Sequence, residues 1–293
     1  MERSSGILLH ITSLPGRFGI GTLGHEAYGF LDFLIESGQK LWQILPLGHT
    51  GYGDSPYQCF SAFAGNPLLI DLEKLVEQEL LKESDLPVEK SFDTDYVDYG
   101  KVVQYKYPLL HKAFENFRLQ ENKVRRMQFE TFCLKNNDWL EDYVFFMSLK
   151  DHFKGKPWWQ WDEAIKLREP EALARYRQHL QVAMEFYRFI QFLFYRQWKA
   201  LKAYANMNDI KIIGDLPLYV SFDSTEAWAN PETFDFDEKR NPHTVAGVPP
   251  DYFSETGQLW GNPIYNWDYL QATDFQWWVH RVKANFNLFD MVR

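Results

Sequence analysis

The 293-residue sequence contains little cysteine: only Cys59 and Cys133 occur, far apart and without C-x-x-C spacing. This scarcity argues against a disulfide framework or a cysteine-based zinc site and favours a reducing compartment. No apolar stretch approaches membrane-spanning length, and the apolar run before Pro15 is too short for a secretory signal. We therefore expect a soluble, cytoplasmic protein.

The sequence also lacks an excess of positive charge. Its formal net charge is −9, with basic and acidic residues interspersed along the chain. This balance argues against nucleic acid or an anionic membrane surface as the main partner. A neutral or small-molecule ligand is the better expectation.

Aromatic residues, in contrast, make up 17% of the chain, and many lie beside Gly, Asn, Asp or Pro in segments typical of loops. Their ordinary role is to fill a core, and the Trp-rich segment 155–164 is better explained as a plug at a helix junction than as a sugar site. Aromatic rings in loops have a second role, because they can stack on the apolar faces of sugar rings. The loop aromatics that favour this role are Tyr57, Tyr252, Phe253 and Trp260.

Short apolar runs alternate with helical patterns at both ends of the chain. Residues 6–12 and 40–45 read as strands on either side of a helix whose C-terminal cap is Gly38. Strand patterns return at 210–214 and 289–292, with a helix over 274–288 before the last. We expect four parallel strands, each buried on both faces.

Between the second and third strands, residues 68–207 have the pattern of long amphipathic helices, including a continuous one from 170 to about 206. The whole predicts an α/β fold: the first four strands of a (β/α)8 barrel, with a large helical insertion after the second. The expected segments are 1–67, 68–207 and 208–293. A doubly wound sheet is the alternative, but no G-x-G-x-x-G follows the first strand.

Working residues of such barrels lie on loops after the strands, and the loop after the second strand contains Asp54, Ser55 and Tyr57. The segment D-S-P-Y is common in turns, so Asp54 has an ordinary explanation as a turn residue. Its position at the end of a strand supports a functional role for Asp54 equally well. There, Tyr57 could stack under a sugar and Asp54 could bond its hydroxyls.

Asp215 follows the third strand directly. A carboxylate beside an apolar strand is costly unless it is paired, so a ligand contact or a structural salt bridge must satisfy it; we favour the ligand. Asp223 and Glu226 lie further along and read better as residues that start a helix.

Residues 241–267 form a long, nearly non-periodic stretch, and loops of such length in compact domains tend to be functional. Aromatic rings and polar groups alternate there, which suits a lid over a polyhydroxylated ligand. The residues expected to contact it are Asp251, Tyr252, Phe253, Trp260 and Asn262. Ordering of the loop by its own aromatic residues is the simpler alternative.

Five stretches resemble the 4-α-glucanotransferases, the amylomaltase or disproportionating-enzyme family related to the α-amylase clan. They are SGILLHITSLPG near the start, SPYQ at 55–58, GDLPLYV at 214–220, GVPPDYFSETGQLWGNPIYNW at 247–267 and the terminal FDMVR. They span the whole chain, and the fourth is long enough to be highly specific.

The resemblance implies a role for several residues. Tyr57 matches a stacking platform, Asp215 a hydroxyl-binding and structural carboxylate, and Arg293 an electrostatic partner of the nucleophile. Tyr252, Phe253 and Trp260 match a loop that covers the glucan on the acceptor side. The family's nucleophilic Asp would follow Arg293 by two residues, and its acid/base Glu comes later still. We therefore expect the chain to end before these groups and to be inactive alone.

The implied reaction is a double displacement with retention at the anomeric carbon, which needs neither metal nor organic cofactor. A segment of an α-1,4-glucan would pass to the 4-hydroxyl of an acceptor. Maltodextrins, maltose and glucose are the expected partners. Two alternatives stay open: an α-glucan hydrolase of the same clan, and a non-catalytic glucan-binding fragment.

Overall fold

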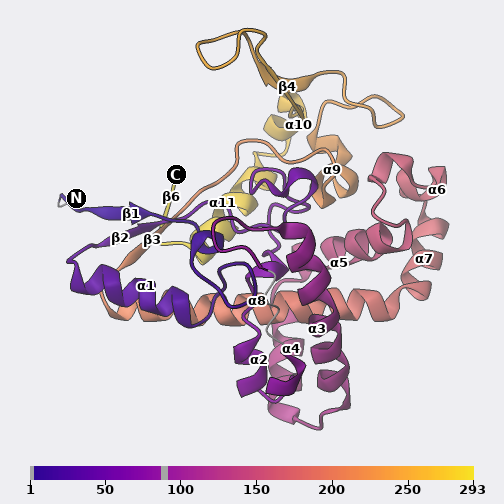
Figure 1. Ribbon diagram of the computed structural model, residues 1–293. Helices are drawn as coiled ribbons and strands as arrows, with labels where there is room; N and C mark the ends of the chain where they lie inside the picture. The colour runs from indigo at the N-terminus through magenta and orange to yellow at the C-terminus, as the bar shows by residue number, and fades with distance from the viewer. Residues whose placement is uncertain (1–2, 87–91) are drawn as a thin grey trace.

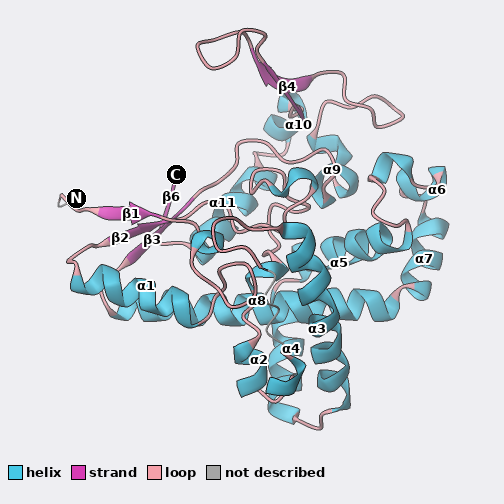
Figure 2. Ribbon diagram, viewed as in Figure 1, coloured by secondary structure: helices cyan, strands magenta, loops and turns pink. Residues whose placement is uncertain are grey.

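A four-stranded parallel sheet lies at one end of the molecule, beside the N-terminus (Figures 1 and 2). The computed structural model describes residues 3–86 and 92–293. The strands, in sheet order, are β1 (Gly6–Leu8), β2 (Leu41–Gln43), β3 (Lys211–Gly214) and β6 (Met291–Val292). Each pairs in parallel with the next, so the four predicted parallel strands are confirmed.

Helix α1 (His25–Glu36) connects β1 to β2 and ends as the sequence predicts. Gly38 has a φ of +70°, a left-handed conformation that glycine adopts without strain. The N–H of Gln39 donates to the carbonyl of Leu34, and that of Gly38 to Ile35, which closes the last turn.

The strands are not all buried on both faces, and that prediction is wrong. Trp42 and Ile212 are fully buried, but Leu8 on the edge strand β1 is 54% exposed. Helices α1 and α8 lie along one side of the sheet (Figure 1). Side chains alternate between the two faces of a strand, so those on the less covered face of β1 meet solvent.

The segment between β2 and β3 is mainly helical. Its helices are α2 (Glu73–Glu77), α3 (Tyr99–Leu119), α4 (Lys123–Lys135), α5 (Asn137–His152), α6 (Glu163–Lys166), α7 (Pro170–His179) and α8 (Gln181–Met207). The predicted continuous helix from 170 to 206 is wrong, because the backbone leaves helical values at Leu180 (φ −103°, ψ 16°). No Gly or Pro marks this break.

No helix of the described residues is both long and apolar enough to cross a membrane.

One apolar cluster runs from the sheet into the helical layer. It includes Trp42 and Ile212 from the strands and Phe189 from α8. Trp158 and Trp161 are also buried in it, at 0% and 4% exposure, as expected for a plug at a helix junction.

Helix α8 holds the chain after β2 through two glutamine side chains. Gln191 donates to the carbonyl of Gly65 and accepts from its N–H, both at 2.8 Å. Gln197 binds Asp71 in the same way, at 2.8 and 3.0 Å. All four residues are buried. These bonds therefore satisfy backbone groups that water does not reach.

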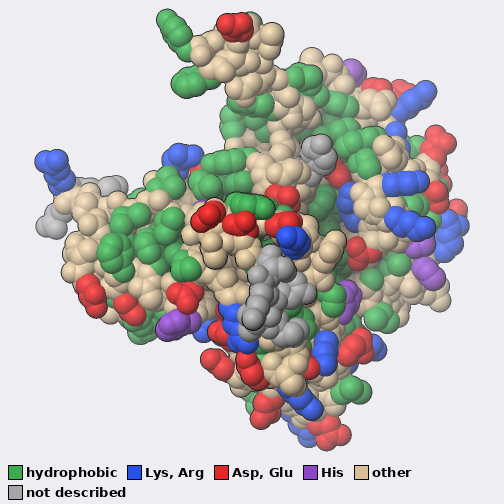
Figure 3. All heavy atoms as spheres, viewed as in Figure 1, with side chains coloured by type: hydrophobic (Ala, Val, Ile, Leu, Met, Phe, Trp, Pro, Cys, Tyr) green, Lys and Arg blue, Asp and Glu red, His purple; other side chains and the backbone are tan. Residues whose placement is uncertain are grey.

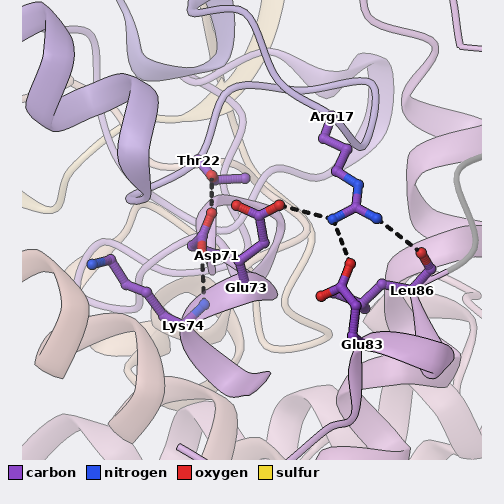
Figure 4. Close-up of polar contacts among 7 residues, drawn as sticks. All are labelled: Arg17, Thr22, Asp71, Glu73, Lys74, Glu83 and Leu86. Atoms are coloured by element: carbon purple, nitrogen blue, oxygen red, sulfur yellow. Dashed lines mark hydrogen bonds and ion pairs between the residues drawn. The ribbon is translucent and has the colours of Figure 1, made fainter. Parts of the chain in front are cut away.

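The loop after β1 is fastened to the helical segment by ionic and polar contacts (Figure 4). Arg17 lies 3.0 Å from a carboxylate oxygen of Glu73 and 2.9 Å from one of Glu83. The hydroxyl of Thr22 donates to the buried carboxylate of Asp71 at 2.7 Å. These contacts fix the loop beside the carboxyl ends of the strands.

After β3 come α9 (Thr225–Ala229) and an antiparallel hairpin, β4 (Val245–Val248) with β5 (Gln258–Pro263). The hairpin projects from the body of the molecule (Figures 1 and 2). Part of 241–267 therefore forms two paired strands. The sequence did not predict these strands, because it has no clear period-two alternation there. Two further helices, α10 (Trp267–Ala272) and α11 (Gln276–Leu288), lead to β6.

Candidate active site

Asp215 is the centre of a polar cluster at the carboxyl end of β3. It is only 5% exposed. Its Oδ1 accepts a hydrogen bond from Arg293 Nε at 3.1 Å, and its Oδ2 from Arg293 Nη2 at 2.8 Å. The hydroxyl of Tyr57 donates to the same Oδ2 at 2.7 Å. Three residues selected from the sequence therefore meet in one cluster.

Pairing of β3 with β6 brings Arg293 to Asp215. The N–H of Arg293 donates to the carbonyl of Gly214 at 2.9 Å, and the N–H of Leu216 to the carbonyl of Arg293 at 3.1 Å. A Cβ at Gly214 would lie 2.0 Å from the ring of Phe289. Glycine at this position thus permits the close approach of the chain before β6, which supplies the arginine.

The cluster combines one negative charge, one positive charge and a neutral phenol. The contact with Asp215 raises the pKa of Arg293, so the guanidinium stays charged. Burial raises the pKa of Tyr57, and the hydrogen bond to Asp215 raises it further, so the phenol keeps its proton. The bidentate bond uses Nε and Nη2 of Arg293, which leaves Nη1 directed elsewhere.

Tyr57 sits on a loop closed by backbone and side-chain hydrogen bonds. The N–H of Gly51 donates to Gln58 at 2.8 Å, and that of Gln58 to Ser55 at 3.0 Å. The hydroxyl of Ser55 accepts from the N–H of Tyr57 at 3.3 Å. The structure thus places Ser55 as a turn residue, while Tyr57 as a whole remains 39% exposed.

Asp54 lies apart from this cluster. It has a φ of +54° and lines a cavity of about 150 Å³ together with His10 and Tyr99. Tyr57 and Asp215 line a different cavity, of about 50 Å³. Burial raises the pKa of Asp54. Asp54 and Tyr57 are close in sequence but line different cavities.

Asn262 ties the base of the hairpin to the loops of the site. It is 5% exposed, its Nδ2 donates to the carbonyl of Val220 at 2.7 Å, and its Oδ1 accepts from Gln58 at 3.2 Å. Asp251, at the far end of the hairpin, is exposed, and its Oδ1 accepts from the backbone N–H groups of Phe253 and Ser254, both at 2.9 Å. Asn262 and Asp251 therefore have structural partners.

The aromatic residues of the hairpin are exposed. The relative accessibilities are 107% for Tyr252, 93% for Phe253 and 45% for Trp260. Hydrophobic side chains stand out at the tip of this projection in the space-filling view (Figure 3). Within the described part of the chain, no hydrogen bond joins these three side chains to Asp215, Tyr57 or Arg293.

Two charged residues near the cluster are buried, and the sequence did not predict their burial. Arg281 on α11 is 1% exposed, and its guanidinium donates to the carbonyl of Pro217. Glu226 is 2% exposed and accepts from the hydroxyl of Ser61 at 2.9 Å. It does lie in the first turn of α9, as predicted, but its side chain points into the core. For Arg281, the sequence offers no local signal, because its burial depends on what packs against α11.

Asp223, the other predicted helix-start residue, precedes the N-cap Ser224. Its carboxylate forms an ion pair with the buried Lys150 at 2.7 Å. Within residues 3–86 and 92–293, no three His, Cys, Asp or Glu side chains gather as metal ligands would.

Comparison with known sequences decides the family. The profile of the 4-alpha-glucanotransferase family matches residues 9–293. The chain belongs to this family. It is 50% identical over its whole length to a 4-alpha-glucanotransferase of Synechocystis and 49% identical to that of Thermus thermophilus, and it covers 58% of each. The chain thus spans less than two thirds of these relatives.

Solved structures of the family agree. Amylomaltase from Streptococcus agalactiae in complex with acarbose has a TM-score of 0.95 and 48% identity, with 100% of this chain and 59% of that one covered. Amylomaltase from Corynebacterium glutamicum, at 18% identity, shares the fold with a TM-score of 0.80 over 99% of this chain and 40% of its own. The resemblance seen in the sequence is confirmed.

Proposed function

We propose that the protein takes part in 4-α-glucanotransfer: a segment of an α-1,4-glucan moves to the 4-hydroxyl of an acceptor glucan or glucose. The observation that carries the proposal is the cluster of Tyr57, Asp215 and Arg293 at the strand ends, in a chain of this family. The acarbose complex of a similar amylomaltase adds support, because acarbose is the ligand named for that structure.

The proposed chemistry is a retaining double displacement. One carboxylate forms a glycosyl-enzyme, and a protonated carboxyl about 5–5.5 Å away releases the leaving sugar. The resemblance implies that both groups lie after Arg293, so we propose the activity for a protein of the relatives' full length. Asp215 occupies Nε and Nη2 of Arg293, so Nη1 remains available, and we propose that it faces the nucleophilic carboxylate. A cation there would keep a nucleophilic carboxylate ionised by lowering its pKa.

Tyr57 is proposed as a platform under the sugar at the cleaved bond. Its hydroxyl is fixed by Asp215, while 39% of the residue remains exposed for stacking. Asp215 is proposed mainly as the group that positions Tyr57 and Arg293. Its Oδ2 already accepts two bonds and its Oδ1 one, so Oδ1 can accept one more, from a sugar hydroxyl.

The hairpin is proposed as the cover over the bound glucan. Tyr252, Phe253 and Trp260 would stack on sugar rings at the acceptor side, and their apolar bulk would keep water from the glycosyl-enzyme. Exclusion of water would favour transfer over hydrolysis. Asp54, Ser55, Asp251 and Asn262 are proposed to support these loops. Ser55 and Asp251 bond within their own turns, and Asn262 joins the base of the hairpin to Val220 and Gln58.

We further propose that the four strands are the first half of a (β/α)8 barrel and that residues 68–207 are a helical insertion in it. The parallel order β1-β2-β3-β6 supports the first part. The free thiols Cys59 and Cys133 support a cytoplasmic location.

The test is incubation with maltotriose, using this chain and one extended to the relatives' full length, with products separated by chromatography. Longer maltodextrins together with glucose from the extended chain are the expected result. Glucose and maltose alone would instead identify a hydrolase. Retention of the extended chain on immobilised amylose without any product would support a binding protein.

A further inference from the structure

The loop that follows Asp215 is held by a buried arginine from another element. Arg281 on α11 donates through Nη2 to the carbonyl of Pro217 and through Nη1 to the hydroxyl of Tyr265 at 3.0 Å. Tyr265 in turn donates to the carbonyl of Leu218 at 2.8 Å. Two consecutive carbonyls, two and three residues after Asp215, are thus fixed by one guanidinium. This contact sets the direction in which the chain leaves the site.

The loop that carries Tyr57 is held by a buried carboxylate. Glu226 on α9 accepts from the hydroxyl of Ser61 at 2.9 Å. That hydroxyl also accepts from the N–H groups of Phe63 and Ala64, at 3.1 and 3.3 Å. Glu226 therefore fixes the turn that follows Tyr57 by four residues.

The two buried charges interact with each other. The charge of Glu226 opposes the lowering of the pKa of Arg281 by burial, and Arg281 likewise opposes the raised pKa of Glu226. No ion pair within 4.0 Å joins these two described residues. Arg281 Nε and Glu226 Oε2 are buried without a hydrogen-bond partner among the described residues. Arg281 and Ser61 also line the same small cavity as Tyr57 and Asp215.

We propose that Arg281 and Glu226 are positioning residues. Arg281 holds the loop after Asp215, Glu226 holds the turn after Tyr57, and together they keep these two loops in register. A buried charge is costly without partners: Arg281 finds them in the carbonyl of Pro217 and the hydroxyl of Tyr265, and Glu226 in the hydroxyl of Ser61. The hydrogen bond between Tyr57 and Asp215, which links loops 158 positions apart in the chain, depends on that register.

The catalytic consequence of this inference rests on the proposed function, but the positioning does not. A readout on Tyr57 itself separates the two. Site-specific 3-fluorotyrosine at position 57 reports, through its ¹⁹F shift during a pH titration, how strongly its hydroxyl is held by Asp215. Loss of that bond lowers the pKa of the phenol.

The test compares Arg281→Met, Arg281→Lys and Glu226→Gln with a matched control, Arg240→Met. Arg240 also clamps backbone carbonyls, those of Lys166, Leu167 and Trp228, but lies outside the site. We expect Arg281→Met to lower the pKa at position 57 by about one unit and Glu226→Gln by less. Arg281→Lys should recover part of the shift, and Arg240→Met should lower the Tm and leave position 57 unchanged.

An unchanged titration at position 57 in Arg281→Met and Glu226→Gln, together with a lower Tm, would overturn the inference and leave both residues as ordinary stabilising groups. If Arg281→Met does not fold, Arg281→Lys and Glu226→Gln give the same decision, because each alters the pair with little change in volume. In the full-length protein, kcat for maltotriose should fall in parallel with the shift. Absence of any glucan transfer by wild type would refute the proposed function without affecting the titration.

Discussion

The loop after β3 and the β4–β5 hairpin carry residues that the sequence assigns to a single site, yet they are held in opposite ways. Asp215 is 5% exposed and bonded to two side chains from distant parts of the chain. Tyr252 and Phe253 are almost fully exposed at the tip of a projecting hairpin. The first region is held by contacts within the chain, whereas the second offers its side chains to solvent.

This difference separates two kinds of contribution to the proposed glucan site. Groups that must keep a fixed geometry are built into the core, because their misplacement costs catalysis directly. Groups that only add contact area can stay exposed, and they gain their partners from the ligand. Substitutions in the two regions should therefore divide into effects on turnover and stability, and effects on binding.

The largest effect is expected for Asp215→Ala. It removes the acceptor of Tyr57 and the partner of Arg293, so stability should fall by about 2–3 kcal/mol. The proposed transfer by a protein of the relatives' full length should fall by about 100-fold or more. Urea unfolding and maltotriose assays measure the two losses. Asp215→Asn, which keeps an acceptor for Tyr57, is the control; equal losses in both variants would mean that charge alone matters.

A smaller effect is expected at Tyr57, where two substitutions separate the ring from the hydroxyl. Tyr57→Phe loses only the bond to Asp215 and should lower kcat about tenfold. Tyr57→Ala also loses the platform and should lower kcat by about a further tenfold. The free energy of unfolding should fall by less than about 1 kcal/mol, because the residue is partly exposed. A large loss of Tm with normal turnover would refute the stacking role.

The loop of Tyr57 should also give an acid-dependent effect through His49. This buried ring lies between the hydroxyls of Tyr143, at 2.8 Å, and Tyr107, at 3.1 Å. Burial lowers its pKa from 6.5 to about 3, so only the unfolded chain takes up the proton between these values. Stability is therefore lost as pH falls through this range.

His49→Gln cannot take up that proton. Its Tm should fall less between pH 7 and pH 4 than that of the wild type, by a few degrees. Thermal unfolding followed by circular dichroism at both pH values measures the difference. Parallel pH profiles in the two proteins would show that His49 does not contribute.

The smallest effect on stability is expected for Tyr252→Ala and Phe253→Ala. Neither side chain is buried, so the free energy of unfolding should stay within about 0.5 kcal/mol of the wild type. In a protein of the relatives' full length, KM for the acceptor in the proposed reaction should rise about three- to tenfold, with kcat little changed. A stability loss comparable to that of Asp215→Ala would contradict the division between the two regions.

Local patterns predicted the strands and the first helix well, because each depends on neighbouring residues. The cap at Gly38 is one such case. Asp215 could be selected because a carboxylate at the end of an apolar strand demands a partner. Its partners could not be derived in that way: Tyr57 and Arg293 entered through their loops and the family resemblance, and their meeting depends on the pairing of strands far apart in sequence.

Other features had no local signal. The break at Leu180 lies within a pattern that is helical on both sides, and the hairpin strands lack clear alternation. Arg281 and Glu226 look like ordinary charged helix residues, since burial on one side of a short helix depends on what packs against it. Asp54 and Tyr57 show the converse: adjacency in sequence did not place them in one cavity.

The paired contacts of Gln191 and Gln197 bear on which changes the chain can tolerate. Each glutamine binds the backbone N–H and carbonyl of one residue, Gly65 or Asp71, and the two partners are as far apart in number as the glutamines are. These contacts require a fixed number of residues between Gly65 and Asp71, but they do not depend on most of the side chains between them. Deleting a single residue between 65 and 71 should therefore be more harmful than replacing several, because no sliding of the segment restores both contacts at once.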